Sequence, residues 1–280
     1  MAHLAKGSGR PILFLHGLSL GGDVFADALA RLSPAFACHA PDLPGHDPDA
    51  PGQEPATIDG AVAFLDAFLE ARGLCDVILV GWSMGATVAW RYLDRHGPGR
   101  VAAMVCLDMS PCVRNRPGWS LGLRGQRPGS LEAQVAAFRN HWPEAAAMIA
   151  GGMFGLAGTS DVMTRAEAEA RIARHDGPTM AGMWASLIEA DERAAVRRLA
   201  VPMLVIHGAE SRLYPPETAR WLERHAPQAR RVCLARSGHA PHLEEPARFA
   251  ETLAEFAATA RPTAGPGGDG RARDLPATKV

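Results

Sequence analysis

Short apolar runs alternate with segments of helical periodicity along most of the chain. Ile58, Ala61, Val62 and Leu65, for example, recur at the spacing of one helix face, and Thr57 precedes them as a candidate N-cap. The runs between such segments are bounded by glycine, proline or polar residues, which is typical of buried strands. The predicted strands are 12–15, 35–39, 77–80, 101–107, 203–206 and 231–234. Strands that alternate with helices predict an α/β fold with a mostly parallel sheet flanked by helices.

Residues 111–190 break this alternation. They contain several helix-like pieces and no convincing strand; Ser130 and the Thr164/Glu167 capping-box pattern suggest helix starts, and Pro178 suggests another. An insertion after one strand of an open sheet lies at the edge where ligands bind. We therefore predict a helical cap over 111–190. The α/β core then comprises 1–110 and 191–260, and the Gly/Pro-rich residues 261–280 are predicted to be a disordered tail.

Composition narrows the class of protein. The chain has 280 residues, 29 Lys+Arg against 30 Asp+Glu and 47% hydrophobic residues, so we expect neither a nucleic-acid nor a membrane partner. No run approaches the length of a membrane span, and no apolar leader segment is evident at the N-terminus. The five cysteines are scattered without a C-x-x-C spacing, which is typical of reduced thiols. We expect a cytoplasmic protein.

The most informative motif is Gly-Trp-Ser-Met-Gly at residues 81–85. It follows the apolar run 77–80 and opens a helical segment at 86–96. In that context G-x-S-x-G indicates a nucleophile elbow, a strand-to-helix turn that lifts the serine out of the sheet edge. Both glycines must then lack side chains so that strand and helix can approach each other. The motif predicts Ser83 as a nucleophile.

A serine hydroxyl needs a base within hydrogen-bond reach, and His239 follows the last predicted strand. Three further motifs occur at strand ends: Leu-His-Gly-Leu at 15–18, Pro-Asp-Leu-Pro-Gly-His at 41–46 and Ser-Gly-His at 237–239. With these motifs and the elbow, the chain resembles the α/β-hydrolase family over roughly residues 10–260. The chain begins too close to His16 to hold two leading strands of larger members, so we expect about six to seven strands.

The resemblance implies a role for each matching position. Ser83 would attack an acyl carbonyl and His239 would take up and return its proton. The backbone N–H groups of Leu18 and Met84 would form the oxyanion hole. It implies a small-molecule acyl substrate, no cofactor and no metal. The His239/His242 pair lacks the acidic or cysteine partners of a zinc site.

The triad acid departs from the family's commonest pattern. The family usually places an Asp at the fourth position of His-Gly-x-x-Asp after the penultimate strand, whereas His207-Gly208 is followed there by Ser211. Glu210, one position earlier, is one candidate. Asp108, which ends the strand after the elbow helix, is the favoured candidate, since some members supply the acid from that strand.

The predicted activity is hydrolysis of a small or medium carboxylic ester, or a thioester, through an acyl-enzyme. The same triad also serves C–C hydrolases, lyases and perhydrolases, and a ligand-binding or receptor homologue with negligible turnover is the alternative of a different class.

Two groups of residues in the predicted cap have a functional and a structural interpretation. Arg114, Arg116, Arg124 and Arg127 would either receive an anionic group or lie on a solvated loop. The large apolar residues would either line an acyl pocket or form core. These residues are Trp119, Trp142, Met148, Met153, Phe154, Met180, Met183 and Trp184.

Overall fold

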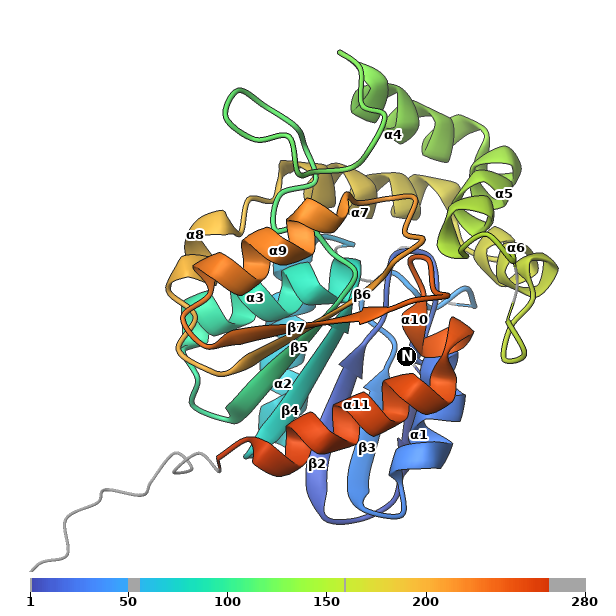
Figure 1. Cartoon of the computed structure of the whole chain (residues 1–280). Helices are drawn as coiled ribbons and strands as arrows, with labels where there is room; N and C mark the ends of the chain where they lie inside the picture. Colours follow the sequence, from blue (N-terminus) through green and yellow to red (C-terminus); the bar gives the residue numbers. More distant parts are fainter. Residues whose placement is uncertain (1, 50–55, 159, 262–280) are drawn as a thin grey trace, which may run out of the picture.

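The computed structural model describes residues 2–49, 56–158 and 160–261, so the predicted tail lies outside the described residues apart from position 261. Within these ranges one seven-stranded sheet has the order β1-β3-β2-β4-β5-β6-β7 (Figure 1). Its strands are β1 (His3–Lys6), β2 (Arg10–Leu15), β3 (Phe36–Pro41), β4 (Val77–Trp82), β5 (Val101–Leu107), β6 (Met203–Gly208) and β7 (Ala229–Leu234).

The predicted α/β class, the mostly parallel sheet and the strand number are confirmed. β1 pairs antiparallel with β3, and the other neighbouring strands are parallel. All six predicted strands are present, and β1 is a seventh strand that the sequence pattern does not predict. β1 is short and mostly exposed, so it lacks the apolar run that marks a buried strand.

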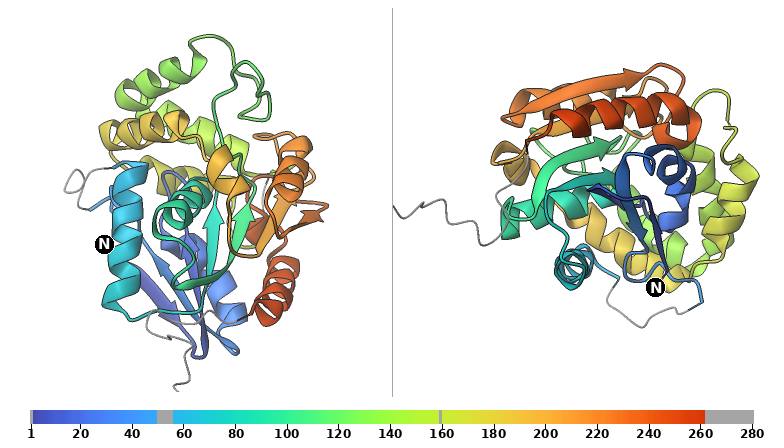
Figure 2. Two further views of the ribbon diagram at one scale, coloured as in Figure 1. Left: turned by 90° about the vertical axis from the view of Figure 1, so that its left-hand side faces the viewer. Right: turned by 90° about the horizontal axis from the view of Figure 1, so that it is seen from below.

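Helices cover both faces of the sheet. Figure 2 shows α11 and α2 on opposite sides of it. η1 (Gly22–Phe25), α1 (Ala26–Leu32), α10 (Pro241–Glu244) and α11 (Pro246–Thr259) contact one another on one side. α2 (Ile58–Ala71), α3 (Met84–His96), α8 (Arg193–Arg197) and α9 (Pro216–His225) form a contiguous layer on the other. The apolar stripe of α2 is buried, and Thr57 caps the helix by accepting from the Gly60 N–H at 3.0 Å.

We refer to residues 111–190 as the cap segment. Its helices α4 (Ser130–Asn140), α5 (Trp142–Met153), α6 (Arg165–Ala173) and α7 (Gly177–Glu189) lie beyond one end of the sheet (Figure 1). Thr164 and Glu167 form the predicted capping box, but Gly129 rather than Ser130 precedes α4. Cys112 pairs with Asp191 in an isolated β-bridge, so the segment leaves and rejoins the rest of the chain at one place.

The sheet register brings three strand ends together. β2 lies between β3 and β4, which is the point where the strand order reverses. Leu15 pairs with Gly81, and Trp82 pairs with Leu107. The loops that follow β2, β4 and β5 therefore emerge side by side at the edge covered by the cap segment.

No helix in the described part of the chain is long and apolar enough to cross a membrane.

Candidate active site

Ser83 occupies a strained turn between β4 and α3. Its backbone angles are φ 52° and ψ −121°, a region that non-glycine residues rarely adopt. A Cβ on Gly81 would lie 2.5 Å from the backbone of Ala86, and one on Gly85 would overlap the Leu15 carbonyl oxygen. The flanking glycines therefore permit the close approach of strand and helix. The turn has the strand-to-helix geometry that the motif predicts, with Ser83 immediately before α3.

His239 lies against Asp108. Its Nδ1 is 2.8 Å from Asp108 Oδ2, and both side chains are buried. The His239 loop is held on two sides, because Trp82 Nε1 donates to the His239 carbonyl at 2.7 Å and the His239 N–H donates to the Met153 carbonyl at 2.9 Å. Asp108 directly follows β5 at φ 42°, a conformation that Asp tolerates better than most residues. The geometry fixes the orientation of the imidazole.

The two candidate acids have different surroundings. Glu210 accepts from the Leu156 backbone N–H of the cap segment at 2.5 Å, whereas the side chain bonded to His239 Nδ1 is Asp108. Ser211, at the family's usual acid position, donates its hydroxyl to Asp108 Oδ2 at 2.6 Å. The structure therefore brings Asp108, and not Glu210, to His239. Ser211 adds a second hydrogen bond to the same carboxylate oxygen.

The loop after β2 lies directly beside the elbow. A Cβ on Gly17 would be 3.3 Å from Ser83 Cβ, and Gly17, Leu18 and Ser83 line one cavity. His16 holds this loop in place, since its Nε2 accepts from the Leu43 N–H at 2.8 Å. Met84, the residue after Ser83, begins α3. The predicted oxyanion donors thus belong to two backbone segments that meet at Ser83.

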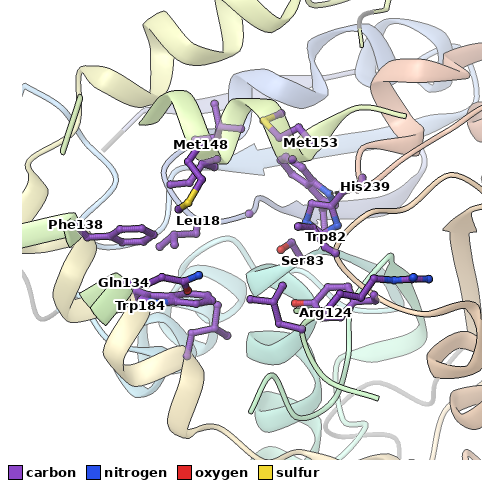
Figure 3. A pocket seen from close by; sticks show the side chains of 18 residues that line it. Leu18, Trp82, Ser83, Arg124, Gln134, Phe138, Met148, Met153, Trp184 and His239 are labelled. Carbon is purple, nitrogen blue, oxygen red and sulfur yellow. Dashed lines mark hydrogen bonds between the residues drawn. The ribbon is translucent and has the colours of Figure 1, made fainter. Parts of the chain in front are cut away.

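Ser83 and His239 share a mostly apolar cavity of about 240 Å³ (Figure 3). Of the large apolar cap residues singled out in the sequence, Met148, Met153 and Trp184 line it. The remaining five, such as Met180 and Met183, are buried elsewhere. Lining residues that the sequence did not reveal include Gln134, Phe138, Leu213 and Tyr214. Sequence position alone gave no signal for them, because they come from separate segments that meet only in the fold.

The four cap-segment arginines singled out in the sequence have different surroundings. Arg114 forms ion pairs with Glu132 at 2.7 Å and Glu189 at 2.5 Å, and Arg116 lies 3.7 Å from Asp191. Arg124 lines the cavity, and its guanidinium has no ion pair or hydrogen bond among the described residues. Of these four arginines, only Arg124 therefore lines the cavity with an unpaired guanidinium.

Several histidines near the site are buried and neutral. Burial lowers the pKa of His16 to about 4 and that of His242 to about 3. It also lowers the pKa of His175, in the cap segment, to about 4. The ring of His242 packs against Trp82 and Phe25, at centroid distances of 4.6 and 4.7 Å. His242 therefore belongs to an apolar cluster behind His239.

These rings make the protein sensitive to acid. An unfolded histidine takes up a proton near its ordinary pKa of 6.5, whereas the buried rings resist protonation until about pH 4 or below. The unfolded state then binds more protons between these values, so stability falls as the pH drops from about 6.5 to about 4. Each ring contributes up to about 1.4 kcal/mol per pH unit. The urea concentration at the midpoint of unfolding should be clearly lower at pH 5 than at pH 7.5. Equal midpoints at the two pH values would contradict this expectation.

The model of the alpha/beta hydrolase family matches residues 12–252. The chain belongs to that family. The predicted resemblance is confirmed, and the protein is an enzyme of the hydrolase type.

Its relatives in the alpha/beta hydrolase family include named esterases. A pimeloyl-[acyl-carrier protein] methyl ester esterase of Nitrosomonas europaea is 30% identical over 251 residues, which cover 87% of this chain and 94% of the relative. The AB hydrolase superfamily protein YisY of Bacillus subtilis is 28% identical, over 89% of this chain and 92% of its own.

Solved structures share the fold. An esterase from Exiguobacterium antarcticum superposes with a TM-score of 0.82 at 20% identity, over 92% of this chain and 95% of its own. A bromoperoxidase from Bacillus anthracis superposes with a TM-score of 0.83 at 20% identity, over 91% and 94%. At such identities the likeness concerns the fold alone.

Proposed function

We propose that this alpha/beta hydrolase cleaves a small or medium carboxylic ester by a serine mechanism. The observation that carries the proposal is the 2.8 Å contact between His239 Nδ1 and Asp108 Oδ2, in the cavity that also holds the elbow serine, Ser83. A nucleophile, a base and a group that orients the base then meet at one site. The esterase names of the sequence relatives agree with this chemistry.

The proposed reaction has two halves. Ser83 Oγ attacks the ester carbonyl while His239 Nε2 accepts the hydroxyl proton, and Asp108 holds the Nδ1–H and stabilises the imidazolium. The Leu18 and Met84 N–H groups, with the N-terminus of α3, stabilise the oxyanion. Collapse breaks the ester C–O bond, and His239 returns the proton to the departing alcohol. Water then attacks the acyl-enzyme by the same steps and regenerates Ser83 with release of the acid.

The volume of the cavity limits the size of the acyl group that the substrate can carry. Its volume of about 240 Å³ lies below the roughly 300–1,000 Å³ of pockets for drug-sized ligands. Most of the lining is apolar, which suits an alkyl or aryl acyl group. A short or medium acyl chain therefore fits better than a long lipid chain, and a thioester of the same acid would pass through the same acyl-enzyme.

Carrier-bound methyl esters are a second candidate. Several relatives are named for pimeloyl-[acyl-carrier protein] methyl ester, and the unpaired Arg124 beside the cavity supplies a cation for an anionic carrier group. If this candidate holds, the enzyme should hydrolyse the methyl ester faster on the carrier than on the free acid, and R124Q should reduce that difference.

The proposed activity is tested with p-nitrophenyl esters from acetate to dodecanoate. We expect a maximum in kcat/KM at short or medium chains, with a burst of nitrophenol close to one equivalent per enzyme if deacylation is the slow step. Absence of hydrolysis above background for every ester would reject the esterase proposal. A maximum at dodecanoate would reject the chain-length limit.

A further inference from the structure

The wall of the cavity across from Ser83 carries hydrogen-bonding groups without partners. Gln134 of α4 lines the cavity, is half-buried, and its side-chain amide makes no hydrogen bond within the described part of the chain. Trp184 of α7 also lines the cavity and is 8% exposed, and its buried Nε1 has no hydrogen-bond partner there either. Buried polar groups are normally paired, so the buried Trp184 Nε1 requires an explanation. The half-buried Gln134 amide lines the same cavity and is free to bind a polar group of a ligand.

In contrast, the polar side chains of His239 and Trp82, near Ser83, have hydrogen-bond partners. His239 Nδ1 is bonded to Asp108, and Trp82 Nε1 is bonded to the His239 carbonyl. Both hydrogen bonds have a role in the proposed mechanism, because they orient His239. The amide of Gln134 and the indole N–H of Trp184 have no role in that mechanism.

Figure 3 shows how these groups are arranged. Ser83 and His239 lie together, whereas Gln134, Phe138 and Trp184 cluster across the cavity from them, and the Gln134 amide points inward. Leu18 and Met148 lie between the two clusters. A molecule that reaches from Ser83 to Gln134 thus crosses an apolar stretch and then meets a neutral amide.

We propose that the cavity selects acyl groups that carry a neutral oxygen function, such as a hydroxyl or ketone, at the end remote from the ester. This inference rests on the proposed esterase function. The acyl group stays on Ser83 through both halves of the reaction, so it is the part of the substrate that the cavity must hold. Its remote oxygen would accept from the Gln134 amide and offset the desolvation of that group. Gln134 is then a specificity-determining residue.

The chemistry of the wall favours a neutral group over a carboxylate. Phe138 is 3% exposed and Trp184 is largely buried, so an anion placed between them would lose its hydration. The one Lys or Arg that lines the cavity, among the residues described, is Arg124. In Figure 3 its guanidinium lies away from the Gln134 cluster, on the side of Ser83 and His239. A plain alkyl chain would leave the amide unpaired.

The test compares methyl esters of plain fatty acids with their terminal-hydroxy and terminal-carboxy counterparts over a series of chain lengths. Methanol is too small to span the cavity, so any effect of the terminal group reports on the acyl side. At one chain length we expect the hydroxy ester to exceed the plain ester about tenfold in kcat/KM, mainly through KM. Q134L should reduce that ratio to about one.

Q228L is the matched control, because Gln228 is exposed and does not line the cavity. It should retain the wild-type ratio. Equal kcat/KM for hydroxy and plain esters at every length, a preference for the carboxy ester, or an unchanged ratio in Q134L would each overturn the inference. If no methyl ester and no p-nitrophenyl ester is hydrolysed, the proposed esterase function has failed instead.

Discussion

Replacing Asp108 with asparagine is expected to lower kcat for ester hydrolysis by about 10⁴-fold. The carboxylate lies 2.8 Å from His239 Nδ1 and favours the tautomer with the proton on that nitrogen. An asparagine amide can donate to Nδ1, which would leave the proton on Nε2 and remove the base that Ser83 needs. Steady-state kinetics with a p-nitrophenyl ester measures the loss, and circular dichroism checks the fold.

The matched variant is E210Q. Glu210 accepts a hydrogen bond from Leu156 in the cap segment, and His239 Nδ1 is bonded to Asp108 instead, so this change should alter kcat by no more than a few fold. A large loss of kcat in E210Q together with a small loss in D108N would identify Glu210 as the triad acid. Equal and mild losses in both would show that neither carboxylate acts as the triad acid.

Replacing Ser83 with alanine is expected to have the largest effect, a loss of about 10⁶-fold in kcat. Alanine removes the atom that would form the acyl-enzyme. The strained backbone at φ 52° accommodates alanine no worse than serine, so the thermal midpoint should not fall. The measurement is hydrolysis at high enzyme concentration, beside a thermal unfolding curve.

S211A provides the comparison for that variant. It deletes a serine hydroxyl that donates to Asp108 at 2.6 Å but does not line the cavity, so about tenfold is the expected upper limit of its effect. If S83A retained more activity than S211A, Ser83 would not be the nucleophile.

Much of the fold and of the candidate site was predictable because the signals are local. The elbow motif is a strand, two glycines and a helix that are contiguous in the chain, and His239 lies in the loop that follows the last strand. Asp108 became a candidate because it directly follows β5, whose pairing with β4 places it beside the elbow. The absence of an acid at position 211 was also visible in the sequence.

The remaining features depend on contacts between distant segments. β1 is defined by its pairing with β3, since its own residues are mostly exposed. Met180, Met183 and Trp184 share α7 and look alike in sequence, yet only Trp184 reaches the cavity. Gln134 resembles any polar residue of a surface helix until α4 and α7 meet over the sheet edge. Which residues of α4 and α7 reach the cavity is determined by the packing of the cap segment and not by the local sequence pattern.

The most direct test of the account is covalent labelling of the enzyme with a fluorophosphonate, followed by peptide mapping by mass spectrometry. The serine mechanism predicts one adduct per chain, on Ser83, with much slower labelling in D108N and none in S83A. An unlabelled wild-type enzyme that still hydrolyses esters, or an adduct on any residue other than Ser83, would contradict it.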